Sequence, residues 1–286
     1  MSDKNLASPS RRRAITSGSL RPRILMYHAI AWVADNAIAR LAKDPNRICV
    51  SPQRFESQMR YLERRGLRGV SVRELLRASG TKRTRNLVGL TFDDGYENFL
   101  QDALPTLERF GFSATLFVLG GMLGGDNVWD EVPRMRLLGA EGVREAAERG
   151  IEIGSHGMGH LRMSGLEPEQ LEREVVESRR VLGKVSGQAV QGFCYPYGNL
   201  DQAAVQAVRR AGYTYACALR KRAEGSVYDL PRPLVWELDN PLTLTAKLRF
   251  HPLFSDIYSD IVHKLTKRTH ATEAIPRGPV GGGPEG

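Results

Sequence analysis

Cysteine is scarce in this sequence. Its 286 residues include three cysteines, Cys49, Cys194 and Cys217, which are odd in number and widely spaced. Small secreted proteins that depend on disulfide bonds place many cysteines close together, so this pattern argues against that class. Unpaired cysteines are typical of a reducing compartment, and we expect a cytoplasmic protein.

Long apolar runs are also missing. No stretch approaches the roughly 20 apolar residues that a helix needs to span a bilayer. Residues 1–23 carry several charges and contain no apolar segment of the kind found in secretory signals. The sequence therefore predicts neither a transmembrane helix nor a secretory leader, and a peripheral position at a membrane stays open as an alternative.

Excess positive charge is scarce in the body of the chain. The net charge is +9, but residues 1–23 carry six Lys or Arg and one Asp, and residues 247–286 carry six Lys or Arg and four Asp or Glu. The stretch between them has a net charge of only about +2 and no basic stripe. Because nucleic-acid-binding domains gather positive charge on one face, we do not expect a nucleic-acid partner.

The two ends of the chain differ in composition from its middle. Residues 1–22 form a basic arm and residues 271–286 are dense in Gly and Pro, so both are predicted to be disordered. Residues 23–246 are predicted to form one folded domain. Residues 247–270 have an amphipathic and basic pattern, from which we expect a helical extension that covers this domain or lies on a membrane surface.

Short apolar runs alternate with helical patterns through the middle of the chain. The clearest helix covers residues 51–66, where Ser51 is a capping residue, Pro52 suits the first turn and Gly66 ends the pattern. Repeated strand–helix–strand units favour an α/β fold with parallel strands, either a barrel or a doubly wound sheet. We predict strands at residues 23–30, 87–92, 113–120, 151–154, 190–195 and 213–219.

Polar residues follow three of these strands. Asp93 and Asp94 come directly after residues 87–92, and His156 and His160 come after residues 151–154. Tyr195 and Tyr197 follow the strand near residue 190. The carboxyl ends of parallel strands meet on one face, where active sites are built. Each cluster alone is a weak signal, but three at successive strand ends predict a shared cleft.

One aspartate and two histidines are a suitable ligand set for a divalent metal. Imidazole and carboxylate groups suit zinc and its first-row neighbours, and three protein ligands leave a position open for water. A bound cation also explains the adjacent acids Asp93 and Asp94. It would neutralise one carboxylate, so the other could stay close and transfer protons.

At these residues the sequence resembles a known family. Its motifs "TFDDG" (91–95), "SHGMGH" (155–160) and "FCYPYG" (193–198) occur in the order found in the polysaccharide deacetylases, metal-dependent carbohydrate N-deacetylases that share the chitooligosaccharide deacetylase homology domain. The "YPYG" form is similar to the branch that acts on poly-N-acetylglucosamine. The resemblance covers roughly residues 23–236. It implies a distorted TIM-like (β/α) barrel of parallel strands that removes an N-acetyl group from an amino sugar or glycan.

The resemblance also implies roles for individual residues. Asp94, His156 and His160 would bind the metal, with zinc expected first and cobalt, nickel or manganese as alternatives. Asp93 would be the catalytic base during attack by metal-bound water. The backbone N–H of Tyr197 would help to stabilise the oxyanion.

The sequence departs from the family pattern in two places. Many members carry an arginine where this chain has Cys194, and Arg232 is either its substitute beside Asp93 or a surface residue. The late leucine-x-histidine motif that often supplies the general acid has no clear match, and His251 lies in unrelated surroundings. His28, at the end of the first strand, is the better candidate for the acid, and a buried histidine bonded to the backbone is the alternative.

Other functions stay open at this point. An amide hydrolase of the same fold could act on a nucleotide sugar, a lipid-linked sugar or an antibiotic precursor. An inactive protein that binds glycans or nucleic acid is a further alternative, against which the intact Asp93 argues. Trp129 lies in a Gly-rich segment and could stack on a sugar ring or pack in the core. The oligomeric state is not indicated.

Overall fold

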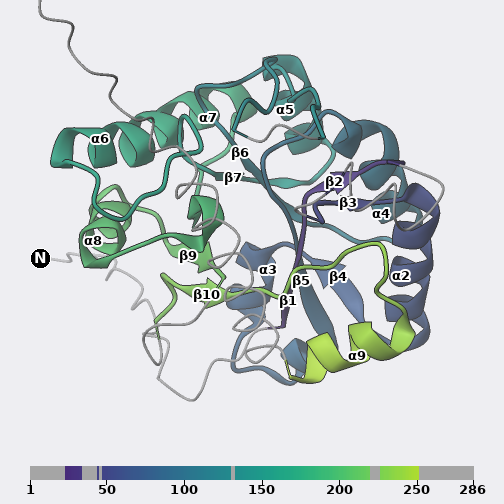
Figure 1. Ribbon diagram of the computed structural model, residues 1–286. Helices are drawn as coiled ribbons and strands as arrows, with labels where there is room; N and C mark the ends of the chain where they lie inside the picture. Colours follow the sequence, from purple (N-terminus) through teal and green to yellow (C-terminus); the bar gives the residue numbers. More distant parts are fainter. Residues whose placement is uncertain (1–22, 34–43, 45–46, 130–132, 220–225, 251–286) are drawn as a thin grey trace, which may run out of the picture.

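Eight parallel strands form the central sheet of this computed structural model, which describes residues 23–33, 44, 47–129, 133–219 and 226–250 (Figure 1). The sheet has the order β1-β5-β6-β7-β8-β9-β10, and β4 also pairs with β5. Its members are β1 (Ile24–Tyr27), β4 (Arg68–Val70), β5 (Leu87–Phe92), β6 (Thr115–Val118), β7 (Glu152–Ser155), β8 (Gly192–Cys194), β9 (Tyr215–Ala218) and β10 (Leu230–Pro231).

The two ends of this sheet meet. The backbone N–H of Met26 in β1 donates to the carbonyl of Pro233 at 3.1 Å, and the N–H of Val235 donates to the carbonyl of Met26 at 2.8 Å. Met26 and Leu234 form a parallel bridge. The sheet is therefore nearly closed into a barrel, as expected, and the doubly wound alternative is wrong. Because β10 spans two residues, the closure depends on the irregular segment that follows it.

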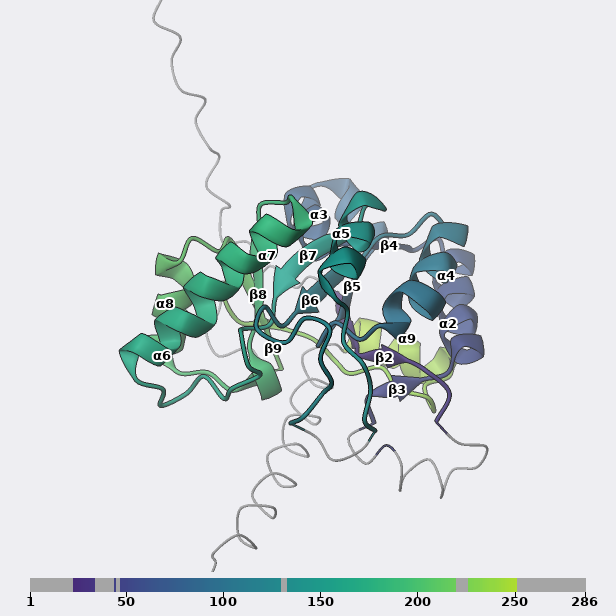
Figure 2. The ribbon, with the colours of Figure 1, turned by 90° about the horizontal axis from the view of Figure 1, so that it is seen from above.

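Helices surround the barrel (Figures 1 and 2). They are α2 (Pro52–Arg64), α3 (Val72–Ala78), α4 (Leu104–Arg109), α5 (Ala140–Glu148), α6 (Pro168–Glu172), α7 (Ser178–Ser186), α8 (Gln202–Arg210) and α9 (Pro241–Arg249). Two helical runs contain a π-helical segment, η2 (Phe99–Ala103) before α4 and η3 (Arg173–Glu177) between α6 and α7. The remaining elements are the 3₁₀ turns η1 (Lys82–Asn86) and η4 (Pro196–Gly198), and a small parallel sheet of β2 (Ala29–Ile30) and β3 (Cys49–Val50).

Helix α2 shows how the local sequence specifies these elements. The Ser51 hydroxyl accepts a hydrogen bond from the N–H of Arg54, and Pro52 occupies the first turn, where its missing N–H costs nothing. Gly66 has a φ of 66°, a left-handed conformation that suits glycine after the end of a helix. The apolar positions of α2 face the barrel. They are Phe55, Met59 and Leu62, all fully buried.

The structure differs from the sequence prediction at several boundaries. The strand predicted at residues 23–30 is interrupted at His28, because β2 leaves the barrel and pairs with β3. Strands β3, β4 and β10 and helix α3 were not predicted. The final helix was predicted from residue 247, but it begins at Pro241 after a capping box formed by Asn240 and Thr243. Residues 251–270, like the predicted disordered ends, lie outside the described residues.

Helix α9 packs against the barrel. The Lys247 ammonium group donates to the carbonyl of Leu234 at 2.6 Å and pairs with the buried Asp239. The amide of Gln58 on α2 donates to the carbonyl of Asp239 at 3.2 Å. These contacts hold the segment that closes the barrel beside β1.

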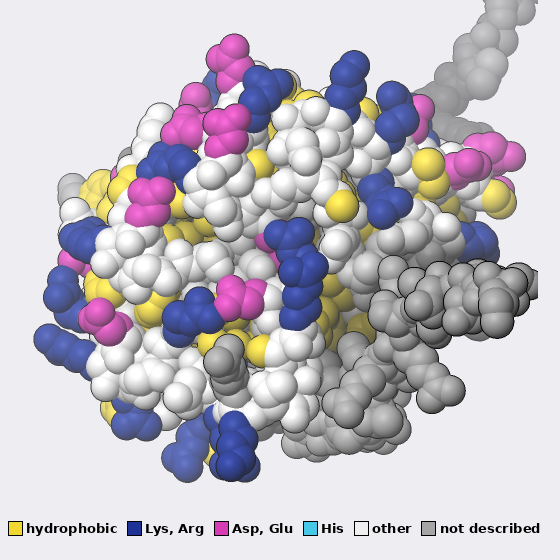
Figure 3. Space-filling model, turned by 180° about the vertical axis from the view of Figure 1, so that it is seen from behind, with side chains coloured by type: hydrophobic (Ala, Val, Ile, Leu, Met, Phe, Trp, Pro, Cys, Tyr) yellow, Lys and Arg dark blue, Asp and Glu magenta, His cyan; other side chains and the backbone are white. Residues whose placement is uncertain are grey.

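The outer surface in Figure 3 has mixed charge. Lys and Arg side chains lie among Asp, Glu and uncharged groups, without a field of one sign on this face. On the described surface as a whole, opposite charges also form pairs, and Arg149 contacts Glu108 and Glu145, each at 2.7 Å. None of the helices in the described ranges is long and apolar enough to cross a membrane.

Candidate active site

The predicted site residues come together at the carboxyl ends of the strands. Asp93 follows β5, and its N–H donates to the carbonyl of Tyr27 at the end of β1, at 3.0 Å. His156 follows β7, and its N–H donates to the carbonyl of Val118 at the end of β6, at 2.8 Å. Each residue is thus fixed by the neighbouring strand as it leaves the sheet. The convergence that the strand order predicted is present.

Asp94, His156 and His160 form a buried cluster. The Asp94 Oδ1 atom lies 3.3 Å from Nε2 of His156 and 3.4 Å from Nε2 of His160. Their candidate ligand atoms all lie within 4.8 Å of one another. Despite two neighbouring imidazoles, Oδ1 of Asp94 is a buried oxygen without a hydrogen-bond partner among the described residues. Such an oxygen is costly to bury unless a further group binds it.

The rings of the two histidines are held by different contacts. Nδ1 of His156 lies 2.8 Å from the carbonyl of Cys194, which directs Nε2 toward Asp94. A backbone carbonyl on the far nitrogen is the usual support of a metal-binding histidine. The ring of His160 is stacked by Trp129 at 4.3 Å and met edge-on by Tyr197 at 4.5 Å.

This geometry fits a divalent cation. Two metal–ligand bonds of about 2.0–2.2 Å at the tetrahedral angle separate their ligand atoms by about 3.3–3.6 Å. Burial raises the pKa of Asp94, but the neighbouring imidazoles of His156 and His160 lower it well below its usual range, so the group is a carboxylate. Burial lowers the pKa of His160 and favours the neutral imidazole that a cation needs.

His156 has the opposite tendency. Burial lowers its pKa, but the neighbouring Cys194 and Asp94 raise it well above the usual value for histidine. The raised pKa favours a proton on this imidazole beside the Asp94 carboxylate. A cation bound at Asp94 would compete with that proton, which makes binding dependent on pH.

Strained backbone conformations gather at the same place. Four residues other than glycine have a positive φ, namely Arg47, Asp94 (72°), His160 (60°) and Tyr197 (57°) among the described residues. Three of the four belong to the cluster or touch it. Left-handed backbone is unfavourable for residues with a Cβ atom and persists where the surrounding structure imposes it, often at functional sites.

Asp93 is paired with Arg232. Nη1 and Nη2 of Arg232 donate to the two carboxylate oxygens of Asp93 at 2.7 and 2.8 Å. Arg232 is 1% exposed, so its interpretation as a surface residue is wrong. Nη1 also donates to Oγ1 of Thr91 at 2.8 Å, and Nη2 lies 2.9 Å from Sγ of Cys194. Burial raises the pKa of Asp93, but the charge and hydrogen bonds of Arg232 lower it below its usual range.

A second candidate set of metal ligands is already bound by Arg232. Asp93, His156 and Cys194 also lie close enough to surround a cation. However, Arg232 contacts both oxygens of Asp93 and the sulfur of Cys194. Burial raises the pKa of Cys194, which keeps it a thiol rather than the thiolate that binds metals. The cluster of Asp94 is the better cation site.

His28 and Tyr197 complete the set of predicted residues. His28 is half-buried after β1, and its positive charge would lower the pKa of both Asp93 and Asp94. Its Nδ1 atom is buried and has no hydrogen-bond partner in the described part of the chain. Tyr197 lies in η4, with the Arg162 guanidinium 4.3 Å above its ring.

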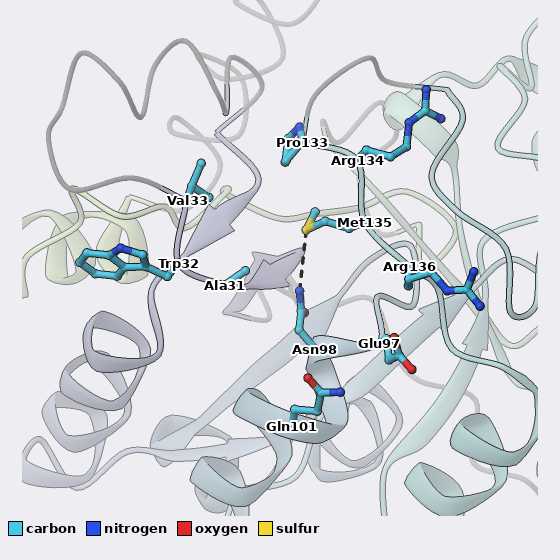
Figure 4. A pocket seen from close by; sticks show the side chains of 10 residues that line it. All are labelled: Ala31, Trp32, Val33, Glu97, Asn98, Gln101, Pro133, Arg134, Met135 and Arg136. Atoms are coloured by element: carbon cyan, nitrogen blue, oxygen red, sulfur yellow. Dashed lines mark hydrogen bonds between the residues drawn. The ribbon is translucent and has the colours of Figure 1, made fainter.

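A pocket of about 490 Å³ is lined by residues of the segments that follow β2 and Asp94 (Figure 4). Glu97 and Asn98 line it three and four residues after Asp94, and Asn98 contacts Met135 across it at 3.8 Å. Trp32, which is 57% exposed, lines both this pocket and a second one of about 380 Å³. Met135 of this pocket and Trp129, which stacks on His160, both pack against one hydrophobic cluster.

Three residues of the site were not predicted. Thr91 accepts from Arg232, and its position in the otherwise apolar strand at residues 87–92 was an available signal. Ser155 and Glu174 bind backbone N–H groups of the loop that carries His156 and His160. Ser155 is the first residue of the motif at residues 155–160, whereas Glu174 comes from a distant helix and was marked only by its spacing to other buried positions.

Comparison with known sequences agrees with the motifs. Residues 80–216 match the family described as polysaccharide deacetylase. A Bacillus subtilis (strain 168) protein, "Putative polysaccharide deacetylase YxkH", is 30% identical over 192 residues, which cover 66% of this chain and 61% of that protein. The poly-beta-1,6-N-acetyl-D-glucosamine N-deacetylase of Staphylococcus aureus (strain MRSA252) is 23% identical over 208 residues, 68% of this chain and 70% of that protein. The chain thus spans about three fifths of the length of YxkH.

Comparison with solved structures supports the fold. The Streptococcus pyogenes deacetylase PplD, solved in complex with acetate, matches with a TM-score of 0.67 and 22% identity, covering 80% of this chain and 99% of that one. IcaB from Ammonifex degensii matches with a TM-score of 0.57 and 22% identity, covering 82% and 96% of the two chains. At 22% identity these likenesses show that the fold is shared, and they do not show which reaction this chain catalyses.

Proposed function

Because residues 80–216 make this chain a member of the polysaccharide deacetylase family, we propose that it hydrolyses the N-acetyl group of an amino sugar within a glycan. One observation carries the proposal. Two imidazole nitrogens converge on one oxygen of Asp94, while Arg232 binds both oxygens of the neighbouring Asp93. Adjacent acids with such different surroundings suit different tasks.

Asp94, His156 and His160 would hold a divalent cation. Zinc suits two imidazoles and a carboxylate best, and cobalt, nickel or manganese could replace it. When bound, such a cation acidifies water and polarises the carbonyl group of the substrate. The carbonyl of Cys194 fixes the ring of His156, and Trp129 limits the movement of His160.

Asp93 is the proposed base. Its lowered pKa keeps it ionised near neutral pH, so it can accept a proton from the attacking water. The bidentate contact with Arg232 prevents the carboxylate from rotating and offsets part of the cost of burying its charge. Asp93 suits this step better than Asp94, because a bound cation would lower the basicity of the carboxylate that holds it.

Tyr197 and His28 are the proposed groups for the remaining steps. The backbone N–H of Tyr197, in its left-handed conformation, would donate to the oxyanion as charge develops there. His28 would protonate the leaving nitrogen, since its ring interacts electrostatically with both carboxylates. The C–N bond breaks to give acetate and a free amine on the sugar. Acetate is also the molecule bound in the PplD structure.

Poly-N-acetylglucosamine is the proposed substrate class. The "YPYG" motif and the likeness to the Staphylococcus aureus enzyme support it. Trp129 would lie against the reacting sugar, and the pocket beside Trp32 would accept a neighbouring sugar of the chain (Figure 4). Hydrolysis of a nucleotide sugar or a lipid-linked sugar is the alternative. Cytoplasmic location and contact with a membrane surface stay predictions.

The experiment is acetate release by the purified full-length chain. Substrates are N-acetylglucosamine oligomers of increasing length and N-acetylated sugar nucleotides, each with and without a chelator. We expect release from the oligomers, loss of activity with chelator and recovery on adding zinc. The absence of acetate release from every N-acetyl sugar, with the cation bound, would contradict the proposal. Release from sugar nucleotides alone would favour the alternative substrate.

A further inference from the structure

The loop at residues 156–160 carries two of the three proposed ligands and has an irregular backbone. Gly157 has a φ of 88° and His160 a φ of 60°. Backbone with such angles does not form the regular hydrogen bonds of a helix or a strand. Those groups must be bonded elsewhere, because buried N–H and C=O groups without partners are costly.

The carbonyl groups of the loop face the segment after β6. The N–H of Gly120 donates to the carbonyl of Gly157 at 2.8 Å, and the N–H of Gly121 donates to the carbonyl of Met158 at 3.1 Å. These bonds fix one side of the loop. The N–H groups of the loop are not bound by this segment and need other acceptors.

The N–H groups of the loop are bound by side chains. The N–H of Gly157 donates to Oγ of Ser155 at 3.1 Å. The N–H groups of Met158 and Gly159 both donate to a single atom, Oε2 of Glu174, at 2.7 and 3.2 Å. One carboxylate oxygen therefore binds two consecutive backbone groups directly between the two histidines.

The placement of Glu174 is unusual for a glutamate. It is 3% exposed, and among the described residues its carboxylate forms no ion pair with Lys or Arg. It lies in the π-helical segment η3, a type of distortion that frequently occurs at functional sites. A Cβ atom added to Gly157 would lie 2.5 Å from Oε2 of Glu174, so the carboxylate fills the space beside that glycine.

We propose that Glu174 is a positioning residue that holds the loop so that His160 and His156 face Asp94 together. Without an acceptor at this place, two N–H groups lose their partner and the loop can leave its left-handed conformation. His160 depends on this most, because its Nδ1 has no hydrogen-bond partner among the described residues. The inference depends on the proposed cation site and adds to it a charged support from a distant helix.

The test measures the zinc affinity of the full chain by competition with a chromophoric chelator. Glu174→Leu keeps the size of the side chain and removes the acceptor, and Glu174→Gln keeps one amide oxygen for both N–H groups. Val175→Ala is the control for stability, since Val175 is buried next to Glu174 in the sequence and its side chain has no hydrogen-bond acceptor for the loop amides. Glu177→Gln is the control for charge, since Glu177 is exposed on the same segment.

We expect Glu174→Leu to weaken zinc binding about 10–100-fold, as the loss of other supports around metal ligands does. Glu174→Gln should recover most of this loss, and both controls should bind zinc as the wild type does. The visible spectrum of the cobalt-loaded Glu174→Leu protein should also change. If Glu174→Leu bound zinc as tightly as the wild type, the inference would be overturned. It would also be overturned if Val175→Ala lost as much zinc affinity as Glu174→Leu.

A second measurement needs no variant. In the wild-type protein without metal, the backbone amides of Met158 and Gly159 should exchange slowly with deuterium, because Glu174 binds both. Rapid exchange of both amides would contradict the inference. If the wild type binds no zinc at all, the proposed function fails, whereas slow amide exchange would still show that Glu174 holds the loop.

Discussion

Replacing Arg232 by methionine tests the buried pair beside the cation site. Arg232 and Asp93 are 1% and 3% exposed, and two hydrogen bonds of 2.7 and 2.8 Å join them. Methionine leaves the Asp93 carboxylate buried without a compensating charge. Removing one partner of a buried ion pair costs about 3–5 kcal/mol of unfolding free energy. We expect a loss in this range for Arg232→Met at neutral pH.

The pH dependence of this loss follows from the pKa of Asp93. Arg232 holds that pKa below the unfolded value, so the pair stabilises the wild type above the unfolded pKa and loses this effect as the pH falls through the folded pKa. In Arg232→Met, burial dominates and the pKa of Asp93 rises. The difference in stability between the two proteins should therefore shrink toward acidic pH, and the acid limb of kcat/KM should move to higher pH in the variant.

The assay is urea denaturation at neutral and acidic pH, together with rates of acetate release across the same range. Arg173→Met is the matched control, because Arg173 is 70% exposed and its contact with Glu177 is 3.8 Å long. Its effect should stay within about 0.5 kcal/mol. Adding Asp93→Asn to Arg232→Met removes the unpaired charge and should restore part of the stability.

The reasoning about the pair is refuted if Arg232→Met unfolds within about 1 kcal/mol of the wild type and its acid limb does not move. In that case the hydrogen bonds between Arg232 and Asp93 would be as weak as those of exposed pairs.

Four further predictions concern the roles of single residues. Asp94→Asn or His156→Ala should lose bound zinc, measured by elemental analysis, and lower kcat/KM at least about 100-fold; a variant that keeps both would contradict the ligand assignment. Asp93→Asn should keep zinc and lose about 10²–10⁴-fold in kcat, and full turnover would exclude it as the base. His28→Gln should lower kcat on N-acetyl sugars by a similar factor but affect an acetate ester of a phenol little, because phenolate leaves without a proton; equal losses on both substrates would argue against an acid role. Trp32→Ala should raise KM for long oligomers roughly 3–10-fold, the effect of losing about 1 kcal/mol of contact, and leave KM for short ones unchanged; an equal change for all lengths would place the neighbouring sugars elsewhere.

The strand-end clusters of the site could be predicted from the sequence because they are local. Asp93, Asp94, His156 and His160 each follow an apolar run that forms a strand, and parallel strands align their carboxyl ends. Closure of the barrel was harder to predict. It depends on residues 233–235, which follow a strand of two residues and have no alternating pattern.

The supports of the site escaped prediction because they come from distant parts of the chain. Arg232 could be named as a substitute beside Asp93, but its burial could not be read from "DLPRPLV". Glu174 stands in a helix with several other glutamates. It shares the buried face with Leu171 and Ser178, three residues before and four residues after it, and this spacing was the one signal available.

The most direct test of the cation site is X-ray absorption of the zinc-loaded protein. The account predicts a shell of nitrogen and oxygen ligands at about 2.0–2.2 Å with scattering from two imidazoles. This is the ligand set of Asp94, His156 and His160, with Asp93 left on Arg232. A sulfur ligand at about 2.3 Å would instead place zinc on Cys194 and Asp93, and it would contradict the division of tasks between the two aspartates.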